Sequence, residues 1–148
     1  MALSVGTKAP EFTAKDSDGN TVSLADFKGK IVVLYFYPKD DTPGCTKQAQ
    51  SFRDNFADYQ SKDMVVLGVS MDDQASHKMF AEKYGLPFVL LADSEGIITK
   101  AYDVYNERNG QGYAQRVTYI INTEGMIDYV DDKVNTESHA QDILARLG

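Results

Sequence analysis

The stretch Ile31-Val-Val-Leu-Tyr-Phe-Tyr37 decides the fold, because it is an unbroken run of β-branched and aromatic side chains. Such a run is typical of a central strand that is buried on both faces of a sheet. The periodicity and turn residues after it predict alternating helices and strands. The expected elements are a helix from Pro43 to about Ser61, a strand at Met64–Met71, a helix at Asp73–Tyr84 and a strand at Phe88–Ala92. This order implies a parallel core.

The two ends of the chain add antiparallel pieces to this core. Turn residues at Asn122–Gly125 predict a late hairpin, and the sequence Asp16-Ser-Asp-Gly-Asn20 predicts an early one. The flanking segments are strands at Arg116–Ile121, Met126–Val130, Glu11–Lys15 and Thr21–Leu24, and a closing helix at Thr136–Leu147. We therefore expect residues 1–148 to form a single α/β domain with a thioredoxin-like fold, in which helices flank a central mixed sheet that begins with an N-terminal β-hairpin.

Composition excludes several classes of function. The chain has 15 basic and 22 acidic residues and a net charge of −7, so nucleic acid and anionic membranes are poor partners. No apolar stretch has the length of a membrane span, and the first residues lack the pattern of a signal peptide. The sequence contains one cysteine, Cys45, which cannot form an internal disulfide. A reducing cytoplasm is the expected location.

Cys45 lies where the apolar strand gives way to a polar helix start. Thr42 suits the N-cap, and Pro43 fits the first helical position because its missing N–H is not needed there. Cys45 then occupies the third helical position, where a capping box carries an acidic or amide side chain. The unpaired N–H groups and the positive end of the helix dipole favour an ionised sulfur, which is the nucleophilic form of cysteine. This placement predicts a reactive thiol.

The residues around Cys45 also carry a family resemblance. Pro38, Thr42 and Cys45 stand in the arrangement P-x-x-x-T-x-x-C, which resembles the active-site motif of the peroxiredoxins. The longer string Pro38-Lys-Asp-Asp-Thr-Pro-Gly-Cys-Thr-Lys47 is similar to the bacterioferritin-comigratory, or Q-type, branch of that family. The resemblance covers essentially the whole chain. Further matches are Gly6–Phe12, Leu24–Lys30, Ser51–Asp54 and Arg116–Asn122.

This resemblance implies a thiol peroxidase that reduces hydrogen peroxide and organic hydroperoxides through a sulfenic acid on Cys45. It implies that Cys45 is the peroxidatic nucleophile, while Thr42 offers a hydroxyl and Arg116 a permanent positive charge to thiolate and peroxide. The residues expected to line the substrate pocket are Pro38, Gly44 and Tyr37. The loop at Tyr105–Gly112 is expected to border the site. No metal or other cofactor is implied.

The chain departs from the Q-type pattern at one position. Many members of that branch carry a resolving cysteine five positions after the peroxidatic one, and this chain has Gln50 there. The recycling thiol must therefore come from another molecule, either thioredoxin, glutaredoxin, glutathione or Cys45 of a second subunit. We expect a monomer, with a weak dimer as the alternative.

Other readings of these residues stay open or fall away. A non-catalytic redox sensor or holdase that is oxidised at Cys45 is the alternative function, since the missing resolving cysteine slows turnover. A thioredoxin-type disulfide oxidoreductase would need Cys-x-x-Cys, and Thr42 stands in place of the first cysteine. Arg53 either pairs with a local acid or orients Arg116. His77 and His139 have no other cysteine or histidine at metal-binding spacing. We therefore place both on solvated helix faces.

Overall fold

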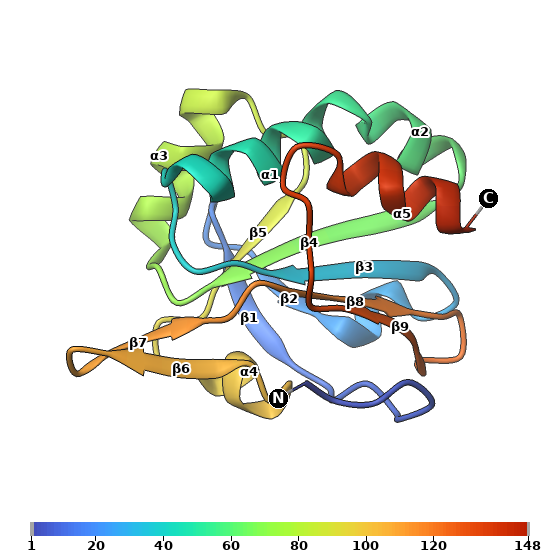
Figure 1. Ribbon diagram of the computed structural model, residues 1–148, viewed down its shortest axis with the longest axis horizontal. Helices are drawn as coiled ribbons and strands as arrows, with labels where there is room; N and C mark the ends of the chain where they lie inside the picture. The colour runs from blue at the N-terminus through green and yellow to red at the C-terminus, as the bar shows by residue number, and fades with distance from the viewer. Residues whose placement is uncertain (1, 148) are drawn as a thin grey trace.

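In a computed structural model, which describes residues 2–147, the chain forms a seven-stranded sheet with the order β2-β1-β5-β4-β3-β8-β9 (Figure 1). The strands are β1 (Thr13–Asp16), β2 (Thr21–Ser23), β3 (Ile31–Phe36), β4 (Met64–Ser70), β5 (Val89–Ala92), β8 (Val117–Ile121) and β9 (Ile127–Asp131). β3, β4 and β5 are parallel neighbours, and the remaining pairs are antiparallel. The expected parallel core and both terminal hairpins are confirmed.

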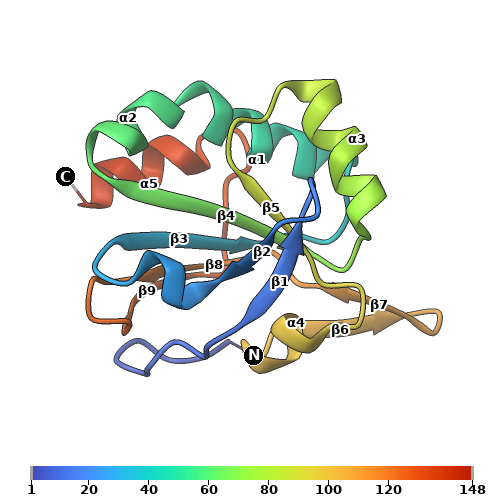
Figure 2. The same cartoon turned by 180° about the vertical axis from the view of Figure 1, so that it is seen from behind.

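Helices cover both faces of this sheet (Figures 1 and 2). One face carries α1 (Pro43–Asp54), α2 (Phe56–Ser61), α3 (Gln74–Tyr84) and α5 (His139–Leu147), and the other carries the 3-10 helix η1 (Leu24–Phe27) and α4 (Ile97–Ala101). Along β3, Val33 and Tyr35 join the cluster under α1, whereas Leu34 and Phe36 join the opposite one, because successive side chains of a strand alternate. No helix within residues 2–147 has the length and apolar character that crossing a membrane requires.

Two segments differ from the sequence prediction. The single helix expected from Pro43 to about Ser61 is broken at Asn55, whose backbone (φ −110°, ψ 9°) leaves the helix and whose side-chain amide donates to the Ser51 carbonyl at 2.8 Å. Asparagine makes such local bonds in competition with the helix. The loop expected at Tyr105–Gly112 is a β-hairpin of β6 (Tyr105–Arg108) and β7 (Gln111–Ala114). Its two-residue turn requires positive φ angles, which Asn109 (54°) and Gly110 (78°) adopt.

Candidate active site

The connection from β3 to α1 places Cys45 in the first turn of the helix. Thr42 has extended backbone angles (φ −95°, ψ 155°), and its carbonyl accepts a hydrogen bond from the backbone N–H of Thr46 at 2.8 Å. Pro43 is the first helical residue and Cys45 is the third, as the sequence predicts. The sulfur is thereby held at the amino end of a twelve-residue helix that packs on the sheet.

The side chain of Thr42 does something other than cap the helix. Thr42 stands at the N-cap, but its hydroxyl makes no capping bond and instead donates to the carbonyl of Lys39 at 2.8 Å. A hydroxyl has one proton and two lone pairs. With the proton engaged, the Oγ1 atom of Thr42 keeps lone pairs that can accept a hydrogen bond from a bound molecule.

Arg116 reaches the sulfur because of how β8 pairs with β3. The two strands are antiparallel with Phe36 opposite Val117, so the residue before β8 lies beside the loop that follows β3. Nη2 of Arg116 donates to Sγ of Cys45 at 3.3 Å, although the two residues are 71 positions apart. Gly44 permits this approach, since a Cβ at that position would lie 3.1 Å from Nη2. The structure thus brings the predicted arginine and cysteine into contact.

A residue that the sequence reasoning missed holds the other arm of the guanidinium. Gln48 follows Cys45 on α1, and its Oε1 accepts from Nη1 of Arg116 at 2.6 Å. The fork of donors therefore bridges an amide oxygen and the sulfur. Gln48 is buried, and its Nε2 has no hydrogen-bond partner within the described residues. The signal that could have identified it is its i, i+3 spacing from Cys45, which places both side chains on one face of the helix.

The sulfur lies in apolar surroundings. Cys45 is 1% exposed and belongs to the cluster between the sheet and α1 that includes Tyr35, Ala49 and Phe52. Burial, followed by the charges of Cys45 and Asp40, raises the pKa of Tyr35 well above its ordinary value, while Arg116 acts in the opposite direction. Exclusion of water strengthens the attraction between a guanidinium and a neighbouring thiolate. The arrangement can therefore hold negative charge at the sulfur.

The other residues expected to line the pocket, Tyr37 and Pro38, make no hydrogen bond to the sulfur of Cys45 within the described residues. Tyr37 is buried, and its hydroxyl donates to Oδ1 of Asp40 at 2.5 Å, away from the sulfur contact. Its ring stacks on Tyr35 with 5.5 Å between centroids, within the same apolar cluster as Cys45. Pro38 follows Tyr37 and is half-buried at the start of the loop. The structure groups Cys45 with Arg116 directly and with Tyr37 only through shared packing.

The prediction that both histidines occupy solvated helix faces is wrong. His77 and His139 are each 0% exposed. His77 lies between a carboxylate of Asp40 and the carbonyl of Leu91, and the Nε2 atom of His139 lies 2.9 Å from the hydroxyl of Thr118. Polar partners inside the fold stabilise histidine there, and a helical pattern cannot reveal partners that come from other elements.

Of the two roles expected for Arg53, the structure shows pairing with a local acid. Its Nε donates to Asp54 at 2.9 Å, and its Nη1 donates to the carbonyl of Tyr84 at 2.8 Å. The bond to Tyr84 ties α1 to the end of α3. Arg53 is therefore a structural residue that links two helices and does not orient Arg116.

Comparisons with known proteins agree over nearly the whole chain. Residues 5–130 match the AhpC/TSA family. The chain is 44% identical to a Coxiella burnetii protein named as peroxiredoxin Bcp, over 99% of this chain and 100% of that one. It is 42% identical to peroxiredoxin Bcp of Bacillus subtilis, over 99% and 96% of the two chains. A crystal structure of a cysteine-to-serine mutant of Xylella fastidiosa PrxQ superposes with a TM-score of 0.92 at 30% identity, covering 99% of this chain and 96% of that one.

Proposed function

This chain belongs to the AhpC/TSA family and is a thiol-dependent peroxidase of the peroxiredoxin type, and from that premise we propose that Cys45 is its nucleophile. The observation that carries the proposal is the 3.3 Å contact between Nη2 of Arg116 and Sγ of a buried cysteine in the first turn of a helix. A guanidinium and a helix start both favour the thiolate, which is the form that attacks a peroxide. Arg116 and Thr42 complete the proposed catalytic set.

The proposed step is a displacement on oxygen. The Cys45 thiolate attacks one peroxide oxygen, a sulfur–oxygen bond forms, and the oxygen–oxygen bond breaks with its electron pair going to the departing oxygen. That oxygen leaves as water or an alcohol after taking a proton, and sulfur is oxidised to the sulfenic acid. Arg116 stabilises the negative charge that shifts from sulfur to the departing oxygen. Stabilisation of developing charge by fixed donors is usually the largest single contribution to catalysis.

Thr42 supports the same step from the other side of the peroxide. Because its proton is bound to the carbonyl of Lys39, its oxygen is free to accept the peroxide proton and so orient the substrate. Backbone N–H groups in the first turn of α1, at Gly44 and Cys45, supply further donors. Pro38 and the ring of Tyr37 are proposed to shield the sulfur from water. This division of roles assigns to Arg116 the positive charge beside the reacting atoms.

Recycling is proposed to use a thiol from another molecule. The sequence has one cysteine, so the sulfenic acid on Cys45 must condense with an external thiol before more peroxide drives it to sulfinic acid. Thioredoxin, glutaredoxin and glutathione are the candidates. Since Cys45 is 1% exposed, a protein thiol can reach it only after the first turn of α1 opens. A monomer in a reducing cytoplasm suits this cycle.

A redox sensor or holdase is the less favoured alternative. The relatives are named as peroxiredoxins, and Cys45 is buried, whereas redox-sensor cysteines are typically solvent-accessible. Steady-state peroxide consumption with each candidate thiol separates the two functions. Continuous turnover supports the enzyme, whereas a single stoichiometric oxidation with every thiol supports the sensor.

The experiment that tests the catalytic assignment compares the parent chain with Cys45→Ser. Stopped-flow competition against a reporter peroxidase measures the reaction with hydrogen peroxide, and intact mass after dimedone treatment identifies the sulfenic acid. We expect rapid consumption and one dimedone adduct in the parent, and neither in Cys45→Ser. Peroxide consumption by the serine variant at the parent rate would contradict the proposal.

A further inference from the structure

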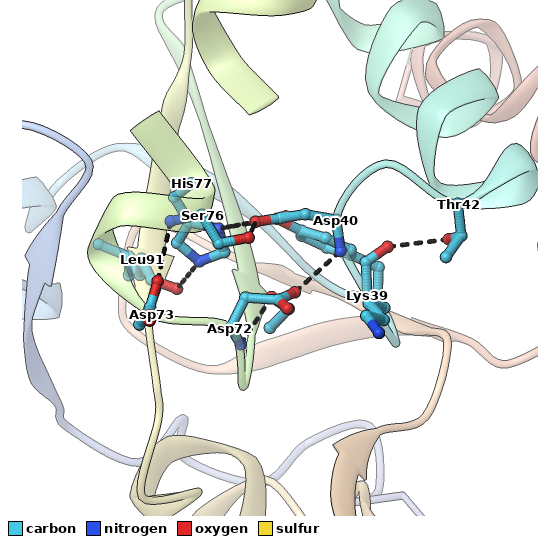
Figure 3. A network of polar contacts seen from close by, with 10 residues as sticks. Lys39, Asp40, Thr42, Asp72, Asp73, Ser76, His77 and Leu91 are labelled. Atoms are coloured by element: carbon cyan, nitrogen blue, oxygen red, sulfur yellow. Dashed lines mark hydrogen bonds and ion pairs between the residues drawn. The ribbon is translucent and has the colours of Figure 1, made fainter. Parts of the chain in front are cut away.

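A buried polar network lies next to the loop that joins β3 to α1 (Figure 3). The side chain of His77 on α3 is 0% exposed, and that of Asp40 in the loop is 4% exposed. Nδ1 of His77 lies 2.7 Å from Oδ2 of Asp40, and Nε2 lies 2.9 Å from the carbonyl oxygen of Leu91 on β5. Asp40 also accepts from the hydroxyls of Tyr37 at 2.5 Å and Ser76 at 2.8 Å. The network is not explained by the peroxide chemistry described above.

The hydrogen-bond partners of His77 and Asp40 require one proton between the two side chains. A backbone carbonyl only accepts, so Nε2 of His77 carries a proton that it donates to Leu91. Oδ2 of Asp40 already accepts from Ser76, and its short contact with Nδ1 requires a proton on that nitrogen too if the carboxylate is ionised. Burial lowers the pKa of His77, but the hydrogen bond and charge of Asp40 outweigh it and raise that pKa above its ordinary value. The 2.7 Å contact therefore holds one proton between Nδ1 of His77 and Oδ2 of Asp40, and the raised pKa of His77 favours its place on the imidazole.

The same cluster has residue types that bind metals, since atoms of Asp40, Asp72 and His77 lie within 4.8 Å of one another. An imidazolium with protons on both nitrogens has no lone pair for a metal.

The backbone N–H of Asp40 donates to Oδ2 of Asp72 at 2.8 Å, and the Ser70 hydroxyl donates to the same oxygen at 2.6 Å. The loop is thus held through its main chain as well as its side chain.

The neighbouring residue fastens the loop on the outside. Asp41 adopts a left-handed backbone (φ 57°), and its carboxylate accepts from Lys83 and Tyr84 on α3 at 2.8 and 2.6 Å. Lys83 and Asp41 are both substantially exposed, so this outer ion pair contributes little. The buried pair is the stronger constraint on the loop conformation.

Buried ion pairs often contribute little net stability, because desolvating the two charges offsets their attraction. A fixed local conformation is the better reason to keep one here. Asp40 lies two residues before Thr42 and five before Cys45, so its position sets the direction in which the chain enters α1. A loop that turned differently would shift Thr42 and the first turn of the helix relative to Arg116.

We propose that Asp40 and His77 are positioning residues for the peroxidase reaction, acting as a buried ion pair that holds the loop so that Thr42 and Cys45 meet the peroxide together with Arg116. This inference rests on the proposed roles of Cys45, Thr42 and Arg116. Neither member of the pair touches the reacting atoms; both act through the backbone of the loop.

The pair also gives the reaction a dependence on pH. The ionisable groups that face His77 are Asp40 from the loop, Asp72 from the turn after β4 and the phenol of Tyr37, while β5 contributes only the carbonyl of Leu91. When His77 loses a proton, either tautomer leaves one lone pair facing another acceptor, at Asp40 or at Leu91. The loop is then released, and peroxide reduction should slow as pH rises through the titration of His77.

The test compares the parent chain with His77→Gln, Asp40→Asn and the matched control Lys83→Gln. Stopped-flow competition measures the rate constant for hydrogen peroxide across pH, and circular dichroism verifies folding. His77→Gln and Asp40→Asn should slow the reaction about tenfold or more, since a shift of about 1 Å in reacting groups can cost about a hundredfold. Lys83→Gln, which breaks the exposed pair on the same loop, should change it less than about twofold.

The pH dependence of the rate constant for hydrogen peroxide separates a positioning role of His77 from a purely structural one. A purely structural role would not link this rate to the titration of His77. The parent rate should fall at high pH with the midpoint at which NMR shows His77 titrating, and this limb should be absent from His77→Gln. A His77→Gln variant with the parent rate and the parent upper limb would overturn the proposal. If that variant does not fold, the parent chain alone tests the proposal. A fall in its rate whose midpoint differs from the pH at which His77 titrates by NMR would also overturn it. A parent chain that fails to consume peroxide would instead refute the assignment of Cys45.

Discussion

His139 should make the protein lose stability in mild acid, and the amount follows from its burial. His139 is fully enclosed, its Nε2 lies 2.9 Å from the Thr118 hydroxyl, and its Nδ1 has no hydrogen-bond partner within the described residues. Burial, only partly opposed by the charges of Asp131 and Asp142, lowers the pKa of His139 from 6.5 to about 4. The folded protein therefore keeps this histidine neutral at pH values where the unfolded chain protonates it.

The direction and size of the effect follow from this difference. Between pH 6.5 and about 4 the unfolded state binds the extra proton, so the free energy of unfolding falls as pH falls through this window. One pKa unit corresponds to about 1.4 kcal/mol, so lowering the pH from 7.5 to 4.5 should remove about 2–3 kcal/mol through His139. His77 acts in the opposite sense, because its raised pKa gives stability that is complete below pH 6.5 and is lost only as pH rises.

Urea unfolding followed by circular dichroism at a series of pH values measures this term. Carboxylates also titrate near the lower end of the range, so the useful quantity is the difference between the parent and His139→Gln. Glutamine keeps a hydrogen-bonding group near Thr118 but cannot gain a proton. The variant should lose about 2–3 kcal/mol less than the parent between pH 7.5 and 4.5. Parallel pH profiles for the two proteins would refute the account of His139 as a buried neutral base.

Three further predictions concern the site. Arg116→Ala should raise the barrier for peroxide reduction by about 2–4 kcal/mol, the cost of removing one donor from a charge-stabilising site; a stopped-flow rate equal to that of the parent would exclude the role of Arg116. Gly44→Ala should slow the same reaction while leaving the melting temperature nearly unchanged, because the added Cβ would lie 3.1 Å from Nη2 of Arg116; an unaltered rate would mean that the guanidinium shifts without consequence. Gln50→Cys should form an internal disulfide with Cys45 after one equivalent of peroxide, with a loss of helical signal, because two positions five apart on a helix must unwind to bond; an intact mass without the loss of two hydrogens would show that position 50 cannot resolve Cys45.

Much of the fold is determined by local sequence. Ile31–Tyr37 predicts a strand buried on both faces, and its side chains do alternate between the two apolar clusters. Thr42 and Pro43 predict the start of α1 and hence the helical position of Cys45. These signals depend on residues within about one turn of each other, so a single sequence contains them. The break at Asn55 was missed because asparagine is tolerated within helices as well as at their ends.

The long-range contacts were decided by tertiary structure. The sequence placed Arg116 near Cys45 only through a family resemblance, and the physical cause is the antiparallel register of β8 on β3. Gln48 joins the site because its side-chain oxygen accepts a hydrogen bond from Nη1 of Arg116, while Nη2 contacts the sulfur. Strand pairing depends on which buried faces fit together across the whole sheet, and no local pattern specifies it.

The buried histidines illustrate the same limit. From the sequence, His77 and His139 occupy polar-looking positions on helices, and the pattern there is the one that a solvated face would give. In the fold, Asp40 and Leu91 enclose His77, and Thr118 meets His139, from elements distant in the chain. The sequence by itself determined where the thiol sits on its helix. Only the tertiary structure decided which charges surround it, because a charge is buried or exposed according to the partners that folding brings to it.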